Sequence, residues 1–189
     1  MHLIIDAHQD IAWNALTFGR DVSRSVNATR ELERGSLAVA RNGSTLLGLD
    51  KYLEGGVAVI FSTLFAAPVR RKEGEWDVLC YTDAREAHRL YARQLDYYER
   101  LMDEHEQFAL IRGRGDLENV LASWHGADAA ARRIGLVPLM EGADAIRKPP
   151  EAEWWRARGV RIVGLAWAGT RYAGGTREPG PLTPEGRAL

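Results

Sequence analysis

The sequence predicts an α/β fold with mainly parallel strands, because short apolar runs alternate with helical segments along the chain. Four of these runs are rich in Val, Ile and Leu and do not alternate with polar residues. Such continuous apolar runs are typical of strands that are covered on both faces, as in a parallel sheet. The strands are expected at residues 3–7, 57–65, 135–140 and 160–167, with a weaker fifth strand at 108–113.

Helices are expected between the strands, and the clearest one covers residues 83–107. Its apolar positions recur at helical spacing and form one stripe, while charged residues occupy the other faces. The stripe consists of Tyr91, Leu95, Tyr98 and Met102. Asp83 is expected to cap the N-terminus of this helix. Shorter helices are expected at 116–124 and 150–158. Residues 20–50 contain two possible amphipathic helices, but Gly, Ser and Asn breaks leave the bounds of these helices unplaced.

The composition is that of an ordinary globular protein. The chain has 189 residues, of which 46% are hydrophobic, and a formal net charge of -1. No charge excess indicates nucleic acid or an anionic membrane surface as a partner. Cys80 is the only cysteine, so the sequence predicts neither disulfides nor a thiolate metal site. The sequence lacks the pattern of a signal peptide or of a membrane-spanning run, and a cytoplasmic location is expected.

The segment "DAHQD" at residues 6–10 places three polar side chains at the end of the first predicted strand. Alternate residues of a strand share one face, so Asp6, His8 and Asp10 are expected to point the same way. The carboxyl ends of parallel strands are where such folds build their sites. An imidazole nitrogen beside a carboxylate makes half of a site for a divalent metal such as zinc. The alternative is a satisfied hydrogen-bond network at the end of the strand.

A further carboxylate lies at the end of a later predicted strand. Glu141 follows the apolar run "LVPLM" and precedes Gly142. An unpaired carboxylate would be costly to bury there, so Glu141 should face a cation or strong hydrogen-bond donors. His8, Asp10 and Glu141 therefore form a candidate cluster of metal ligands on one face of the sheet.

Several separate segments resemble a known family. These segments occur in the order and approximate spacing of the membrane (renal) dipeptidase family of zinc peptidases, within the amidohydrolase superfamily. They are "IDAHQDIAW", "YLEGGVAVIFST", "GLVPLMEGADAI", "GVRIVGLAW" and "GPLTPEGRAL". The resemblance implies a (β/α)8 TIM-like barrel with two zinc ions at its C-terminal mouth. It also implies hydrolysis of dipeptides, in which a metal-activated hydroxide attacks the scissile carbonyl.

The resemblance also assigns roles to individual residues. His8 and Asp10 match the ligands of the first metal, and Glu141 matches the catalytic glutamate that bridges both metals. Asp6 matches the family's leading aspartate, which is expected to hold the His8 ring in its tautomer and orientation. Trp167 stands where many members have a histidine that contacts the substrate. Because indole donates a hydrogen bond but cannot accept one, substrate recognition is expected to differ at this position.

Length is the largest departure from the family. A (β/α)8 barrel typically needs about 250 residues, so residues 1–189 are expected to form the N-terminal part, about half, of a single catalytic domain. The family's two histidines for the second metal lie beyond the segment "LTPEG", which stands close to the end of this sequence. The unpaired strand edges of a half-barrel invite self-association, and a homodimer is expected.

Three functions remain open from the sequence. The first is a zinc-dependent dipeptidase that acts on small dipeptide-like molecules. The second is another amidohydrolase that acts on non-peptide amides or lactones, although such enzymes more often carry H-x-H on the first strand, where this chain has Asp10. The third is a truncated metal-binding fragment without activity, because the ligands of the second metal are missing.

Other polar residues have simpler interpretations. His88 and His105 fall in the charged helix at 83–107 and are expected to be solvated. The Gly-rich segment 168–181 is expected to border the substrate cavity. Its candidate contacts to the substrate are Arg171, Tyr172 and Arg177.

Overall fold

One parallel sheet forms the centre of the computed structural model, which describes residues 2–126 and 128–189. The strand order is β1–β2–β6–β5, and β7 also pairs with β6. The bounds of the strands are β1 Ile4–Gln9, β2 Val57–Phe65, β5 Phe108–Leu110, β6 Ile134–Glu141 and β7 Ile162–Gly164. All pairs are parallel, so the carboxyl ends of the strands lie at one edge. The predicted α/β class with parallel strands is confirmed.

Strand β6 has neighbours on both of its edges. It pairs with β2 over most of its length, and this pairing ends with Phe65 opposite Glu141. The other edge of β6 pairs with β5 near its start and with β7 near its end, where Gly164 lies opposite Glu141. Pro138, which has no N–H to donate, lies between these two stretches. Glu141 is therefore flanked by the ends of two other strands.

Helices and short elements connect the strands. The α-helices are α1 Ile11–Phe18, α2 Val26–Leu32, α3 Leu37–Asn42, α4 Leu49–Gly55, α5 Ala84–Glu104, α6 Arg114–Ser123, α7 Ala152–Ala157 and α8 Pro184–Ala188. The 3-10 turns are η1 Val69–Arg71, η2 Ala129–Ala131, η3 Ala143–Ala145 and η4 Pro149–Glu151. Two small sheets complete the list: β3 Ala67–Pro68 pairs with β4 Cys80–Tyr81, and β8 Ala173–Gly175 forms an antiparallel hairpin with β9 Glu178–Leu182.

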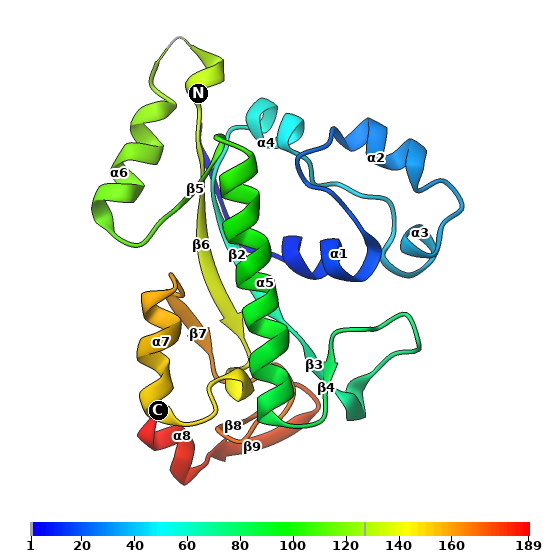
Figure 1. Ribbon diagram of the computed structural model, residues 1–189, viewed down its shortest axis with the longest axis vertical. Helices are drawn as coiled ribbons and strands as arrows, with labels where there is room; N and C mark the ends of the chain where they lie inside the picture. Colours follow the sequence, from blue (N-terminus) through cyan, green and yellow to red (C-terminus); the bar gives the residue numbers. More distant parts are fainter. Residues whose placement is uncertain (1, 127) are drawn as a thin grey trace.

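Helix α5 is the longest helix of the described residues and lies along the sheet (Figure 1). As predicted, Asp83 caps it, because the Asp83 carboxylate accepts hydrogen bonds from the backbone N–H groups of Arg85 and Glu86 at 2.8 Å each. Leu95 and Tyr98 of the predicted stripe are buried. The helix ends three residues before the predicted boundary at 107, where the chain turns into β5.

The last strand of the sheet is shorter than predicted. The sequence predicts a strand over 160–167, but β7 ends at Gly164. Beyond Gly164, the carbonyl of Leu165 accepts hydrogen bonds from the N–H of Ala143 in η3 and from the hydroxyl of Thr170, so its partners are no longer residues of β6. Residues 20–50, where the sequence indicates two possible helices without placing them, contain α2, α3 and the start of α4.

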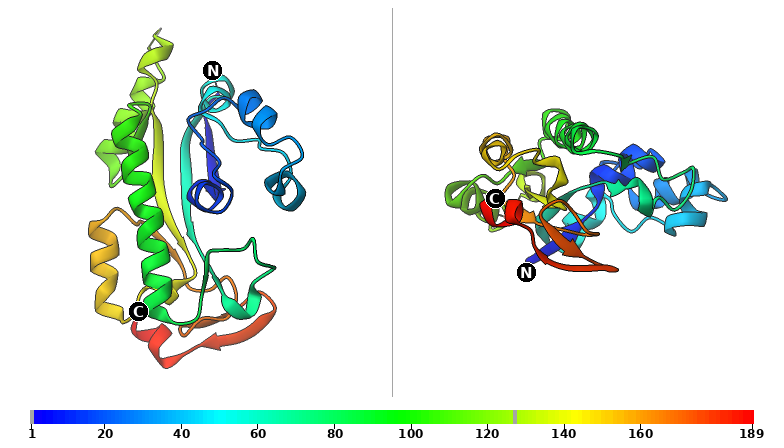
Figure 2. Two further views of the ribbon diagram at one scale, coloured as in Figure 1. Left: turned by 45° about the vertical axis from the view of Figure 1, so that its right-hand side comes forward. Right: turned by 90° about the horizontal axis from the view of Figure 1, so that it is seen from below.

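The sheet curls like part of a barrel and leaves open edges (Figure 2). On β1, Ile4 and Ile5 are 47% and 60% exposed, and Val163 on β7 is also exposed. Apolar side chains on the outer strands β1 and β7 are therefore open to solvent. No described helix combines the length and the apolar composition that a membrane crossing requires.

Candidate metal centre

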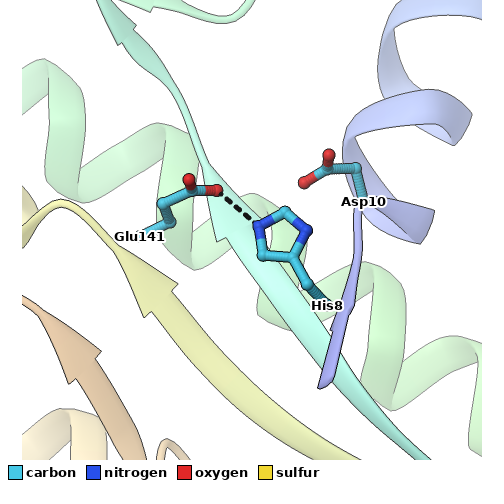
Figure 3. A group of neighbouring side chains, drawn as sticks. All are labelled: His8, Asp10 and Glu141. Atoms are coloured by element: carbon cyan, nitrogen blue, oxygen red, sulfur yellow. Dashed lines mark hydrogen bonds and ion pairs between the residues drawn. The ribbon is translucent and has the colours of Figure 1, made fainter. Parts of the chain in front are cut away.

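Three of the predicted site residues meet at the carboxyl edge of the sheet. His8 is the next-to-last residue of β1, Asp10 directly precedes α1, and Glu141 is the last residue of β6. One ligand atom from each lies within 4.8 Å of the other two. His8 Nε2 and Glu141 Oε2 are 2.9 Å apart and share a hydrogen bond (Figure 3). The parallel pairing produces this meeting, because it brings the ends of β1 and β6 to the same edge on either side of β2.

The three side chains gather negative charge around one imidazole. Burial raises the pKa of Glu141, and its hydrogen bond with His8 offsets only part of that effect. For His8, burial lowers the pKa, but the hydrogen bond with Glu141 and the nearby carboxylates outweigh burial and raise the pKa above its ordinary value of 6.5. A positive charge is therefore favoured here, either as a proton on His8 or as a bound cation.

The donor set suits a divalent cation. An imidazole nitrogen and carboxylate oxygens are ligands that zinc takes in proteins. His8 is exposed, while Asp10 and Glu141 are half-buried, so an ion can reach the three side chains from solvent. Within residues 2–126 and 128–189, this is the only group of three or more His, Cys, Asp and Glu side chains so placed.

Thr63 supports Asp10 and is not predicted from the sequence. Its hydroxyl donates a hydrogen bond to Asp10 Oδ1 and lies 3.1 Å from the carbonyl oxygen of Gln9. Thr63 is fully buried in β2, the strand next to β1. The signal available in the sequence is weak: Ser62 and Thr63 place two hydroxyl groups inside an otherwise apolar strand, near its carboxyl end.

The resemblance implies that Asp6 holds the ring of His8. In the structure, Asp6 instead binds the backbone N–H of His8. Asp6 Oδ1 accepts a hydrogen bond from the backbone N–H of His8 at 3.0 Å, and Oδ2 accepts one from Gln9 Nε2 at 2.7 Å. Gln9 in turn accepts a hydrogen bond from the hydroxyl of Tyr52 in α4. Among the described residues, the hydrogen-bond partner of the His8 ring is Glu141. Asp6 therefore holds the end of β1 in shape, one step removed from the imidazole.

Comparison with known proteins places the chain in a family. The whole chain, residues 1–189, matches the model of the membrane dipeptidase family, peptidase family M19. The chain belongs to the membrane dipeptidase family. A search of curated proteins found no match.

Solved structures of membrane dipeptidases share the fold of this chain. Dipeptidase AC, a metallo peptidase of family M19, superposes with a TM-score of 0.61 at 17% identity, over 91% of this chain and 45% of that chain. A metallo peptidase from Rhodobacter sphaeroides, liganded with a phosphinate mimic of the dipeptide L-Ala-D-Ala, gives a TM-score of 0.61 at 15% identity, over 91% and 48%. The chain therefore spans less than half the length of these structures, and the curled sheet corresponds to part of their fold.

Trp167, the departure from the family pattern, lies beside the candidate metal centre. Its ring packs edge-on against Phe65 at the end of β2, with ring centroids 5.0 Å apart. Its backbone N lies 3.8 Å from the position that a Cβ on Gly142 would take, next to Glu141. A contact of Trp167 with substrate remains a prediction.

The Gly-rich segment 168–181 borders a different cavity from the one beside His8 and Asp10. A cavity of about 820 Å³ includes Arg171 and much of the β8–β9 hairpin, but none of the three candidate ligands lines it. Arg171 is tied to the backbone instead, because its guanidinium donates to the carbonyl of Ile146 at 2.8 Å. Tyr172 is fully buried and donates to the same carbonyl. In this arrangement both side chains are engaged with the backbone, and a contact of Arg171, Tyr172 or Arg177 with substrate stays a prediction.

His88 is expected to be solvated, but in the structure it is covered. Its Nδ1 lies 3.1 Å from the carbonyl oxygen of Ala145, and its ring packs against Trp154 and Trp155 with centroid distances of 5.1 and 5.0 Å. The charged surface of α5 predicts that the His88 side chain is exposed to solvent. Helix α7 covers it with the indole rings of Trp154 and Trp155.

Proposed function

We propose that this chain is the metal-binding part of a zinc-dependent dipeptidase. One observation carries the proposal: His8, Asp10 and Glu141 converge on one point in a chain of the membrane dipeptidase family. The three residues are 133 positions apart at their extremes, so local sequence effects do not explain their convergence. Catalytic zinc sites use three protein ligands and leave a position open to water or substrate, and a solvent-accessible cluster of one imidazole and two carboxylates can supply such a set.

The residues of this chain would divide the work as follows. His8 Nε2 and the carboxylates of Asp10 and Glu141 would hold the ion, with Thr63 fixing the orientation of Asp10 and Asp6 fixing the backbone of His8. A bound zinc ion supplies Lewis acidity and lowers the pKa of water to near neutrality. Burial raises the pKa of Glu141 because it disfavours the charged carboxylate, and a bound cation would offset that cost.

The substrate is proposed to be a small dipeptide-like molecule. A cavity of about 290 Å³ lies directly beside His8 and Asp10, lined also by polar side chains of Asn14 and Asn42 and by apolar ones of the 44–47 segment. A second candidate, an amidohydrolase acting on non-peptide amides or lactones, is favoured by Trp167, which cannot accept a hydrogen bond as the family histidine does. A second zinc ion, which the family resemblance implies, belongs to the proposal, and Glu141 would be its ligand in this chain.

The test uses the full-length natural protein. We expect the purified protein to contain zinc and to hydrolyse a panel of dipeptides faster than lactones or non-peptide amides. His8→Ala and Glu141→Ala should each weaken zinc binding by about a hundredfold or more, since they remove ligands and not only supporting groups. The matched control is His125→Ala, because His125 is exposed and far along the chain from the site. A wild-type protein without metal affinity, or a His8→Ala variant of normal activity, would rule the proposal out.

Two further expectations belong to the proposal. The exposed apolar side chains along β1 favour a homodimer, and sedimentation of the full-length protein tests it. A cytoplasmic location is tested by cell fractionation. A monomer at micromolar concentration would contradict the homodimer. Recovery from another compartment would contradict the cytoplasmic location.

A further inference from the structure

The buried face of helix α5 carries three polar side chains where an apolar stripe alone would suffice for packing. Tyr91, Gln94 and Tyr98 occupy positions i, i+3 and i+7, which share one face of a helix. Each is at most 1% exposed. Burying a polar group is costly unless it is hydrogen-bonded, so the partners of these three side chains show what the face is built to contact.

All three side chains contact backbone groups at the ends of the site strands. The Tyr91 hydroxyl donates to the carbonyl oxygen of Glu141 at 2.6 Å. The Gln94 amide makes two bonds to Phe65, donating to its carbonyl at 2.8 Å and accepting from its N–H at 2.9 Å.

Tyr98 joins β2 to the turn that follows Asp10. Its hydroxyl donates to the carbonyl oxygen of Thr63 at 3.0 Å and accepts from the N–H of Ala12 at 3.2 Å. Thr63 is the residue whose side chain holds Asp10, and Ala12 lies two positions after Asp10 in the first turn of α1. One hydroxyl therefore connects both backbone segments that place the Asp10 carboxylate.

These contacts occur where strand pairing runs out. Phe65 and Glu141 are the last paired residues of β2 and β6, so their backbone groups need partners beyond the sheet. Helix α5 supplies those partners from a single rigid element that spans the ends of both strands and the start of α1. The spacing between the strand ends is thereby tied to the fixed spacing of three side chains on one helix.

We propose that Tyr91, Gln94 and Tyr98 are positioning residues that set the separation of Asp10 and Glu141 and so the metal affinity of the site. This inference rests on the proposed function only in taking His8, Asp10 and Glu141 as metal ligands. Metal–ligand distances in proteins keep to standard values within about 0.2 Å, so a shift of one strand end that moves a ligand further than this should weaken binding. Removal of a supporting hydrogen bond typically costs about 10- to 100-fold in metal affinity.

The experiment compares tyrosine hydroxyls on one helix. Tyr91→Phe and Tyr98→Phe remove a single oxygen each and leave the packed rings in place. Tyr97→Phe is the matched control, because the Tyr97 hydroxyl makes no hydrogen bond with the described residues. Leu101→Ala is a second control, which loosens the packing of the same helix and removes no hydrogen-bonding group. The full-length protein is loaded with Zn²⁺ against a competing chelator, and separately with Co²⁺ for its visible absorption spectrum.

We expect Tyr91→Phe and Tyr98→Phe to weaken Zn²⁺ binding by about tenfold and to change the Co²⁺ spectrum, with Tyr97→Phe unchanged in both. Leu101→Ala should lower the unfolding temperature while retaining the wild-type spectrum. If both tyrosine variants bind with wild-type affinity and spectrum, or if Leu101→Ala reproduces their effect, the positioning role is overturned and the proposed function stands. If the wild-type protein itself binds no metal, the proposed function falls, and this role falls with it. Should Tyr98→Phe fail to fold, Tyr91→Phe decides alone.

Discussion

Two regions near the carboxyl edge of the sheet are held in place in opposite ways. The ends of β2 and β6 are held by α5 through buried, uncharged hydrogen bonds from Tyr91, Gln94 and Tyr98. The β8–β9 hairpin is held instead by charge. Arg70 and Arg71 each donate to the carboxylate of Glu178 at 2.7 Å, and half of the Arg70 side chain is exposed.

These two kinds of contact fix the ends of β2 and β6 more firmly than the β8–β9 hairpin. A buried neutral hydrogen bond is costly to leave unmade and does not depend on salt or on protonation near neutral pH. An exposed ion pair is weak and is screened by salt. The candidate ligands thus lie on the firmly held side, and the hairpin lies on the adjustable side.

The largest expected effect is on the firmly held side. Gln94→Leu leaves the N–H and the carbonyl of Phe65 without their side-chain partners in a buried setting. We expect the free energy of unfolding to fall by about 2–6 kcal/mol, at about 1–3 kcal/mol for each of the two unpaired groups. Urea unfolding followed by circular dichroism measures it. Gln107→Leu is the control, since the Gln107 side chain makes no hydrogen bond to the described residues, and a loss of equal size there would remove the contrast.

A smaller effect is expected on the adjustable side. Glu178→Gln removes the charge that both arginines share, so β8 and β9 should separate more often from η1. Hydrogen exchange of the backbone amides in residues 173–182 should accelerate several-fold, with no change in the core of β6. Glu153→Gln provides the matched change in an exposed pair elsewhere. Equal exchange rates in the hairpin before and after Glu178→Gln would show that the ion pairs do not hold it.

Acid should release the hairpin without a mutation, over a defined range. The hydrogen bonds from Arg70 lower the pKa of Glu178 from 4.5 to about 2, with help from Arg71. Because the folded-state pKa is the lower one, the stabilisation is fully present above pH 4.5 and is lost as the pH falls toward about 2. Amide exchange in residues 173–182, corrected for its intrinsic pH dependence, should rise across this range in the wild type and stay flat in Glu178→Gln. A parallel rise in both proteins would contradict the assignment to Glu178.

The sequence predicts the firmly held side well as far as the strands go. The continuous apolar runs at 57–65 and 135–140 match β2 and β6 closely, since burial on both faces leaves a direct mark on composition. The meeting of His8, Asp10 and Glu141 also follows from the sequence, because parallel strands share an edge at their carboxyl ends.

The contacts that support these residues do not follow from the sequence. The helical stripe predicts that Tyr91 and Tyr98 are buried, but it treats them as apolar and cannot name the backbone atoms that their hydroxyls meet. Gln94 interrupts the stripe, and its partner Phe65 lies 29 positions earlier in the chain. Asp6 is predicted to touch an imidazole and meets a backbone N–H instead. Each of these partners is fixed by packing between distant segments.

The hairpin and the surface of α5 are predicted least well. Segment 168–181 is rich in Gly and short of apolar side chains, so nothing in its pattern indicates β8 and β9 or the role of Glu178. The pattern of α5 alone predicts that His88 is solvated, because it carries no information about Trp154 and Trp155 of α7, which cover the His88 ring.

The wide separation of the site residues along the chain has a consequence for biosynthesis. His8 leaves the ribosome long before Glu141, which follows it by 133 residues. The cluster is therefore complete only once β6 has docked beside β2, a contact between remote segments that forms late and slowly. Zinc binding would then report the time at which β6 docks beside β2. A zinc-sensitive dye added during refolding would measure that time.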